Sequence, residues 1–187
     1  MKNILVITFS DIPKDARVLR QLSVVREFGH VTTLAYGEKA EFADEHLRID
    51  SSLPSLPQTP AGVAALAAHR FRTAERLIPA AKQGLKLVGN RKFDAIIAND
   101  ARALPLGMAI AGDDTPVWAD LHEWAPEERT QLLSWRLLVA PLMRDICKTY
   151  LPSTAAQTTV AGHIAQLYQK HFGVTPSVMR NAPAWQD

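Results

Sequence analysis

Each of three apolar segments of the chain leads into polar side chains that can do chemistry. In chain order these are Asp15 and Arg17, then Asn99 and Asp100, and finally Asp120, His122 and Glu123. If the segments are parallel strands of one sheet, their carboxyl ends lie at one edge and the side chains converge there. Carboxylates, an amide, an imidazole and a guanidinium at a cleft suit a ligand that is rich in hydroxyl groups. The sequence therefore predicts a polar site at one edge of a sheet.

His122 and Glu123 are the candidate catalytic residues of this site. A neutral imidazole accepts a hydrogen bond from a hydroxyl with one nitrogen and donates one with the other, which would suit His122 to contact with a ligand hydroxyl. Glu123 either orients His122 or takes a proton from a reacting hydroxyl as a general base. The structural alternatives are a histidine that ties a loop and a solvated acid at the end of a strand.

The other five residues are candidate contacts to the substrate. A guanidinium matches a phosphate or carboxylate in a bidentate pair, which is the chemistry expected of Arg17. Asp15 either contacts the substrate or caps the first helix. Asn99 and Asp100 either bond hydroxyls or cap the helix that follows them, and Asp120 lies beside His122 at the same strand end.

Strands and helices alternate along most of the chain. Residues 3–9 form an apolar run typical of a strand that is buried on both faces. Apolar residues at helical spacing follow from Val18 to Phe28, with Gly29 as the expected stop, and residues 31–36 form the second strand. Strand, helix and strand make a right-handed βαβ unit, so this sheet is expected to be parallel.

The later elements continue this alternation. They are a short strand near 47–49, a long basic helix over 61–92 that Pro79 kinks or divides, a strand at 94–98, a helix at 104–111, a strand at 116–121, a helix over 127–150 broken near Pro141, a strand at 157–160, a helix at 162–172 and a strand at 177–179. The pattern predicts an α/β fold, a Rossmann-like doubly wound parallel sheet of six to seven strands with helices on both faces.

Several other kinds of site are excluded by the residues present. The loop after the first strand has no glycine, so a dinucleotide-binding G-x-G-x-x-G is absent, and neither a P-loop nor a G-x-S-x-G elbow occurs. His122-Glu123 does not begin a zinc-binding H-E-x-x-H, because the last position is Pro126. Cys147 fits a small core residue. No metal and no cofactor are expected.

Charge and hydropathy limit where the protein acts and what it binds. The formal net charge of +2, from 21 Lys and Arg against 19 Asp and Glu, is too balanced to indicate nucleic acid. No signal peptide or membrane span is evident, which predicts a cytoplasmic protein. The basic helix 61–92 would suit peripheral contact with the inner face of a membrane. A solvated face on a helix packed against the core is the alternative.

Five segments in order resemble family 4 glycosyltransferases. They are Asp15-Ala-Arg-Val with Phe28-Gly-His-Val-Thr-Thr-Leu, then Phe93-Asp-Ala-Ile-Ile-Ala-Asn-Asp, then Asp120-Leu-His-Glu-Trp-Ala-Pro, then Thr158-Thr-Val-Ala, and Val178-Met-Arg-Asn-Ala-Pro. The family's glycines in the first loop are replaced here by residues 11–15. Asn181 is expected to be a structural residue at a hinge.

The resemblance implies one half of a GT-B glycosyltransferase. Residues 1–187 would form the acceptor-binding N-terminal domain, with the C-terminal donor-binding domain absent and the isolated domain inactive. The complete enzyme would be a retaining, metal-independent hexosyltransferase of polysaccharide biosynthesis. It would move a sugar from a nucleotide-sugar donor to a glycan, lipid-linked or small-molecule acceptor, with His122 on the sugar. A sugar-nucleotide 2-epimerase of the same fold and a non-catalytic carbohydrate- or nucleotide-binding domain are the alternatives.

Overall fold

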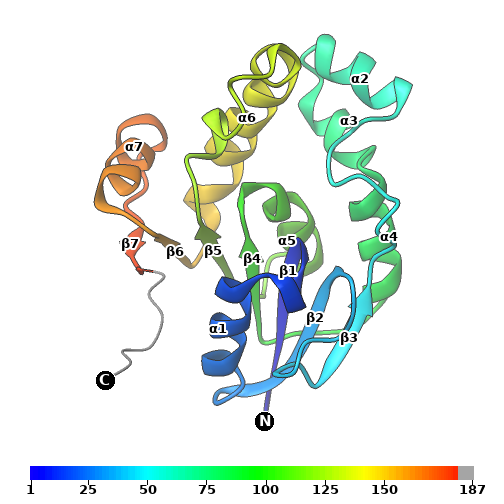
Figure 1. The fold of residues 1–187 in the computed structure, drawn as a ribbon, viewed down its shortest axis with the longest axis vertical. Helices are drawn as coiled ribbons and strands as arrows, with labels where there is room; N and C mark the ends of the chain where they lie inside the picture. Colours follow the sequence, from blue (N-terminus) through cyan, green and yellow to red (C-terminus); the bar gives the residue numbers. More distant parts are fainter. Residues whose placement is uncertain (181–187) are drawn as a thin grey trace.

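The structure is a computed structural model that describes residues 1–180, and its centre is a seven-stranded parallel sheet (Figure 1). The strand order is β3-β2-β1-β4-β5-β6-β7. The strands are β1 (Lys2–Asp11), β2 (Gly29–Tyr36), β3 (Glu45–Arg48), β4 (Ala95–Asn99), β5 (Val117–Leu121), β6 (Ala156–Thr159) and β7 (Ser177–Val178). The predicted Rossmann-like parallel sheet is confirmed. Asn181 lies outside the described residues.

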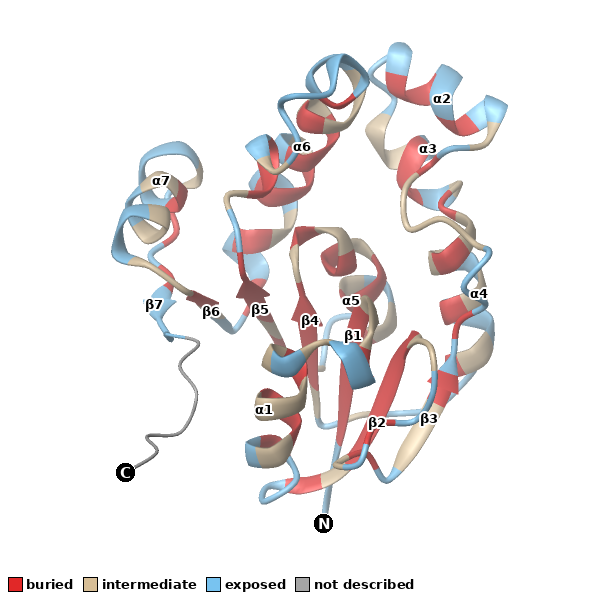
Figure 2. Cartoon of the chain, viewed as in Figure 1, coloured by how far each residue is buried: buried red, intermediate tan, exposed pale blue. Residues whose placement is uncertain are grey.

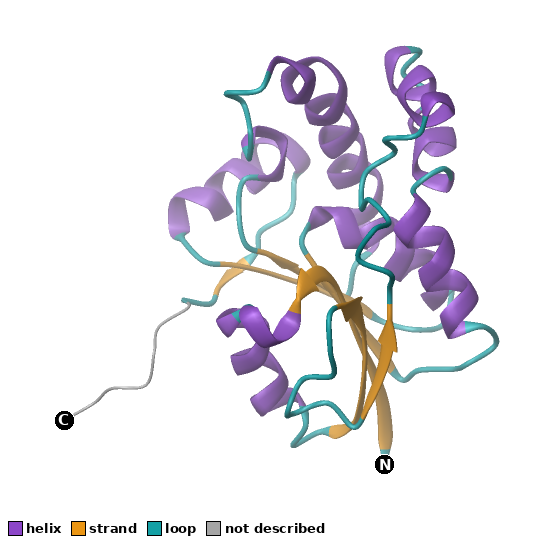
Figure 3. Cartoon of the chain, turned by 45° about the vertical axis from the view of Figure 1, so that its right-hand side comes forward, coloured by secondary structure: helices purple, strands orange, loops and turns teal. Residues whose placement is uncertain are grey.

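Helices cover the two faces of this sheet unequally (Figure 3). The α-helices are α1 (Ala16–Val25), α2 (Pro60–Ala67), α3 (Phe71–Arg76), α4 (Pro79–Val88), α5 (Leu104–Ala111), α6 (Ala140–Tyr150) and α7 (Gly162–Phe172). The chain moves one way along the sheet from β1 to β2 and the opposite way from β4 to β7. Right-handed crossovers therefore place α1 on one face and α5 to α7 on the other, where α2 to α4 also lie.

The buried side chains form two cores, one on each face. On the larger side, Leu5 and Ile7 of β1 pack in one cluster with residues of α5 and α6. On the smaller side, Ile4 and Val6 pack with Val18, Leu22 and Val25 of α1. Figure 2 shows the buried residues concentrated in the central strands. Because β1 is buried on both faces, its unbroken apolar run is explained.

The first helix ends earlier than its apolar pattern predicts. Helix α1 stops at Val25, and Phe28 is 68% exposed. Gly29 is not a helix stop but the first residue of β2, where it pairs with Lys2. A Cβ atom there would lie 2.2 Å from the carbonyl oxygen of Lys2, so close strand pairing explains the glycine.

The predicted basic helix over 61–92 is three short helices instead. Pro60 and Pro79 begin α2 and α4, because proline fits the first helical turn but not the interior. Between them, His69 has a φ of 54°, which no helix interior adopts. Arg72 of α3 is 41% exposed and pairs with Glu75 and Asp145. The division at Pro79 is confirmed, but the further break at His69 makes the single basic helix a wrong prediction. The membrane contact based on that helix stays untested.

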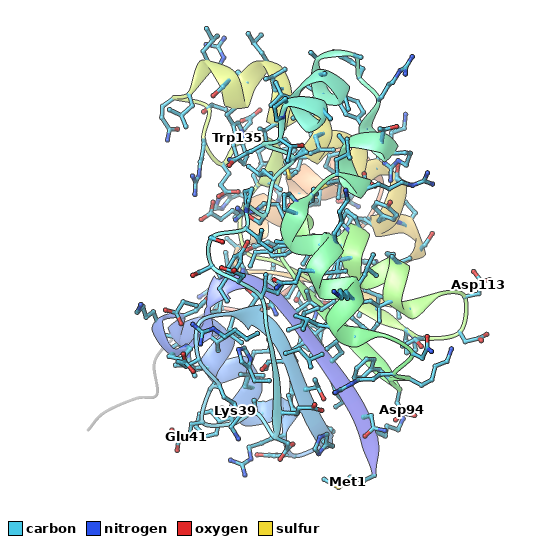
Figure 4. The ribbon with its side chains drawn as sticks, turned by 90° about the vertical axis from the view of Figure 1, so that its right-hand side faces the viewer. Met1, Lys39, Glu41, Asp94, Asp113 and Trp135 are labelled. Carbon is cyan, nitrogen blue, oxygen red and sulfur yellow. The ribbon has the colours of Figure 1, made fainter. Side chains whose placement is uncertain are left out.

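The region predicted as a helix over 127–150 is helical only in its second part. A short 3₁₀ turn (Ala125–Glu127) and several turn residues precede a π-helix (Trp135–Val139) and α6. The indole of Trp135 is buried and donates to the carbonyl of Pro126 at 3.3 Å. Figure 4 shows Trp135 at the opposite end of the molecule from Met1 and Asp94. Cys147 lies in the core as predicted, and burial raises the pKa of its thiol to about 12.

Across residues 1–180, no helix combines the length and the apolar character that crossing a membrane requires.

Candidate active site

The end of β5 places an imidazole between two carboxylates. Asp120 is the last residue but one of β5, and His122 follows the strand directly. His122 Nε2 lies 2.9 Å from Asp120 Oδ2, and His122 Nδ1 lies 3.1 Å from Asp100 Oδ1. The side chain of His122 is 2% exposed and that of Asp120 is 9% exposed. Carboxylates from two neighbouring strand ends therefore hold one buried ring.

These contacts change the expected chemistry of His122. Burial alone would lower its pKa, but hydrogen bonds to Asp100 and Asp120 and the charges of both carboxylates raise it above the usual range. An imidazolium ion donates from both nitrogens and accepts with neither. The neutral His122 that accepts a bond from a sugar hydroxyl is therefore not the form that this geometry favours. Its catalytic role stays a prediction.

Asp120 is the centre of a buried network of hydrogen bonds. Gln21 Nε2 donates to Asp120 Oδ2 at 2.8 Å, and Thr158 Oγ1 donates to Asp120 Oδ1 at 2.6 Å. The Trp118 indole in turn donates to Thr158 at 2.8 Å. The carboxylate thus has its main partners inside the protein, so it anchors the site more than it offers a free acceptor to a substrate.

Asn99 belongs to the same interior network. It is 1% exposed, and its amide nitrogen lies 3.0 Å from Gln21 Oε1 and 3.4 Å from the carbonyl of Ile7. The expected contact between Asn99 and substrate hydroxyls does not agree with this burial. Asn99 instead fixes Gln21, which fixes Asp120.

Sequence reasoning missed Gln21 and Thr158. Gln21 falls on the buried stripe of α1 with Val18, Leu22 and Val25, and an uncharged polar residue on such a stripe is the signal that could have found it. Thr158 lies beside Asp120 in the register of β5 and β6. Only the strand pairing could have revealed that neighbour.

Asp100 has a strained backbone. Its φ of 68° and ψ of 156° lie in a region that glycine occupies almost alone. The side chain is 33% exposed. Burial would raise the pKa of Asp100, but the hydrogen bond and charge of His122, with Arg102 and Arg17, hold it below the usual range. Such strain is typical of functional sites, where the surroundings enforce it.

The first loop supplies a helix cap and a cation. Asp15 accepts bonds from the backbone amides of Arg17 and Val18, both at 3.3 Å, and from Ser10 Oγ at 2.9 Å. Its capping role is confirmed. Arg17 lies near Asp100, and its buried Nε atom has no hydrogen-bond partner among the described residues.

Glu123 is exposed and does not orient His122. Its backbone carbonyl accepts a bond from Tyr168 at 2.9 Å, while no hydrogen bond of its carboxylate appears among the described residues. Asp100 and Asp120 orient His122 instead. The possible role of Glu123 as a general base stays a prediction.

Two cavities meet at His122. The larger has a volume of about 570 Å³ and is lined by Arg17, Asp120 and His122 at its polar end. A much smaller one, of about 10 Å³, is lined by Asp100, His122 and Glu123. Asp15 lines a third depression with Arg17. The structure therefore brings the predicted residues of three strand ends to one edge, although Asn99 lines none of these three cavities. Within residues 1–180, no group of three or more His, Cys, Asp or Glu side chains is placed to hold a metal ion.

Comparison with solved structures shows the fold. HepE of Anabaena, solved with UDP-glucose, has a TM-score of 0.54 and 15% identity over 97% of this chain and 44% of its own. Sucrose-phosphate synthase from Thermosynechococcus elongatus has a TM-score of 0.57 and 11% identity over 96% and 47%. CalG4, the calicheamicin glycosyltransferase, has a TM-score of 0.51 and 12% identity over 100% and 54%. This chain spans about half of each.

No protein-family model matches the chain, and no curated protein matches it. The similarity is therefore one of fold: the chain has the α/β architecture of about half of each of these proteins.

Proposed function

We propose that the chain is the acceptor-binding N-terminal domain of a retaining, metal-independent glycosyltransferase. The complete enzyme would transfer a hexosyl group from a nucleotide sugar to a glycan, lipid-linked or small-molecule acceptor. The observation that carries the proposal is the imidazole between Asp100 and Asp120 at the carboxyl ends of neighbouring strands. It occupies the edge at which open α/β sheets bind ligands. The similarity of fold to a named glycosyltransferase and to a protein solved with UDP-glucose supports it.

The exposed carboxylates are the groups suited to an acceptor. Asp100 is partly exposed and Glu123 is exposed, so both can accept hydrogen bonds from substrate hydroxyls. Glu123, whose carboxylate makes no hydrogen bond within residues 1–180, is the candidate general base. The ion pair with His122 fixes the orientation of Asp100.

The cations at the same edge suit the negative charge of a leaving nucleotide. Arg17 lies near Asp100, and the raised pKa of His122 favours its charged form. Fixed positive charge at a site where negative charge develops lowers the barrier to reaction. Donor binding itself is assigned to a second domain, because the chain spans only 44–54% of the proteins that it resembles. The chain alone is expected to be inactive.

The test uses the protein that contains this chain at its natural full length. Release of nucleotide from a panel of nucleotide sugars is measured with sugar and lipid-linked acceptors. Glu123→Gln is expected to lower kcat by about 10²-fold or more, which is the usual contribution of a general base. Glu41→Gln is the control. Glu41 is exposed and lies at the opposite end of the molecule from Trp135 (Figure 4). Its activity is expected to match that of the wild type.

Two results would contradict the proposal. Conversion of the sugar nucleotide to an isomer with no glycosylated acceptor would indicate a 2-epimerase. Binding of sugars or nucleotides without turnover of any activated sugar would indicate a non-catalytic domain.

A further inference from the structure

Three leucines at one end of the molecule form an exposed apolar patch, the leucine patch. Leu132, Leu133 and Leu137 are 48%, 65% and 61% exposed and lie in or just before the π-helix (Trp135–Val139). The backbone amide of Arg136 donates to the carbonyl of Leu132 at 3.1 Å, so the chain is already helical here. Side chains four residues apart, such as Leu133 and Leu137, then lie on one side of the turn. Large apolar side chains gathered on a surface mark a site of interaction.

A buried tryptophan fixes the segment that carries the patch. Trp135 is 3% exposed, and its indole donates to the carbonyl of Pro126. Because Trp135 occupies the inner side of the turn, the leucines before and after it lie on the outer side. Figure 2 shows exposed residues along this turn and along the neighbouring helix α2. The exposure of the leucine patch is therefore set by the packing of its own segment.

Arginines surround the leucine patch. Residues 129–144 contain three arginines and no Asp or Glu, and residues 51–74 contain two arginines and no Asp or Glu. The two segments are neighbours, because α2 packs against the π-helix (Figure 1). The acids that precede the first segment, Glu127 and Glu128, pair with Arg144 and with Arg102 and Arg129. Arg70 and Arg136 are exposed and make no ion pair among the described residues, so a negatively charged partner complements this end.

The shape of the leucine patch suits a bilayer. Its side chains line none of the three cavities at the site, and they stand on a turn at the end of the molecule that carries Trp135 (Figure 4). A protein partner would need a recess that matches each leucine. A lipid interface instead adapts to such side chains, because it takes leucine among the acyl chains and arginine among the headgroup phosphates.

The strand-end site faces the same end of the molecule. Met1 precedes β1 and lies at the opposite end from Trp135 (Figure 4), so β1 and the strands parallel to it run toward the leucine patch. Asp100 and His122 follow the carboxyl ends of two of these strands. A surface that binds the leucine patch would therefore lie on the side toward which the site opens.

We propose that the leucine patch, with Arg70 and Arg136, is a docking surface for an anionic lipid bilayer. It is a different surface from the single basic helix over 61–92 that the sequence pattern predicted. The docking itself does not depend on sugar transfer. One consequence rests on the proposed function: of the three classes of acceptor, the lipid-linked class is the one that a docked chain would meet.

The test measures binding of the 187-residue chain to vesicles by flotation. One set of vesicles is phosphatidylcholine, and the other is equal parts of phosphatidylcholine and phosphatidylglycerol. The chain is expected to bind the anionic vesicles at least about tenfold more tightly, because each unpaired arginine contributes about fivefold near a negatively charged surface. Sodium chloride at about 0.5 M is expected to weaken this binding, since it screens the charges.

Two leucine substitutions locate the apolar contact. The double variant Leu133→Ser with Leu137→Ser is expected to weaken binding to the anionic vesicles at least about tenfold, because it removes side chains that the bilayer would bury. Phe28→Ser is the matched control. Phe28 is 68% exposed and precedes Gly29, which pairs with Lys2 at the other end of the molecule.

One arginine substitution locates the electrostatic contact. Arg136→Gln is expected to weaken binding to the anionic vesicles about fivefold and to leave binding to the neutral vesicles unchanged. Lys39→Gln is the control, since Lys39 is exposed and lies at the opposite end from Trp135 (Figure 4). All the substituted residues are exposed, so the variants are expected to unfold at the temperature of the wild type.

Three results would overturn the proposal. They are equal binding to the two kinds of vesicle, equal losses in the patch variants and their controls, and a dimer of the chain that the double leucine variant dissociates, which would make a second copy the occupant. No donor or acceptor is present in these measurements. Failure of membrane docking is thereby distinguished from failure of the proposed activity.

Discussion

Replacing Asp120 with alanine is expected to lower the free energy of unfolding by about 3–5 kcal/mol at pH 6. The substitution leaves the buried His122 ring without one of its two carboxylates. It also removes the acceptor of the bonds from Gln21 and Thr158, both of which are buried. A buried donor that loses its partner keeps the cost of its desolvation. Urea denaturation of the variant and the wild type measures the difference.

Two further variants distinguish the loss of the buried hydrogen-bond network from the loss of a negative charge alone. Glu123→Ala removes an exposed carboxylate at the same strand end and is expected to change the stability by less than about 0.5 kcal/mol. The double variant Asp120→Ala with His122→Leu is expected to lose less than the sum of the single losses, because the two side chains interact directly. Additive losses, or a stable Asp120→Ala protein, would show that the pair is not coupled.

The stabilisation that depends on His122 is expected to decline as the pH rises above about 6.5. Asp100 and Asp120 raise the pKa of His122 in the folded protein, against the effect of burial. The contribution is therefore fully present below the pKa of the unfolded histidine and is lost as the pH rises through the folded pKa. The pKa of Asp100 shifts the other way, so its contribution is present above about 3.8 and is lost as the pH falls through its lower folded pKa.

The difference in stability between the wild type and His122→Gln isolates this effect, because glutamine does not titrate. Denaturation curves at intervals between pH 5 and pH 9 are expected to show a difference that is largest near pH 5–6 and shrinks toward pH 9. A difference in stability that grows with pH would mean that burial, and not the two carboxylates, has the larger effect on the pKa of His122.

The fold was predictable because its main signal is local. The apolar runs of β1, β4 and β5 and the spacing in α5 and α7 gave those elements nearly at their observed bounds. The failures occurred where tertiary contacts decide. Phe28 continues the apolar pattern of α1 but lies beyond the helix end and lines the larger cavity, and Gly29 is needed for strand pairing. The stripe from 61 to 88 is continuous in sequence, but the positive φ of His69 and the proline at position 79 divide it.

The position of the site was predictable from the sequence, but the protonation state of His122 was not. Parallel strands end at one edge, so Asp100, Asp120 and His122 could be placed together from their order alone. The identity of the partners of His122 depends on side-chain directions and on the register of β4 and β5. Glu123 is next to His122 in sequence but makes no hydrogen bond to it within residues 1–180, whereas Gln21, 99 residues from Asp120, completes the network.

The most direct test of the account is the protonation of His122 in the folded chain. Nuclear magnetic resonance of the ¹⁵N-labelled ring nitrogens, assigned by their loss in His122→Gln, follows its titration. The contacts to Asp100 and Asp120 predict a midpoint above pH 6.5 with both nitrogens protonated below it. A midpoint below 6.5, with a neutral ring through the neutral pH range, would contradict the carboxylate–imidazolium site on which the proposed function rests.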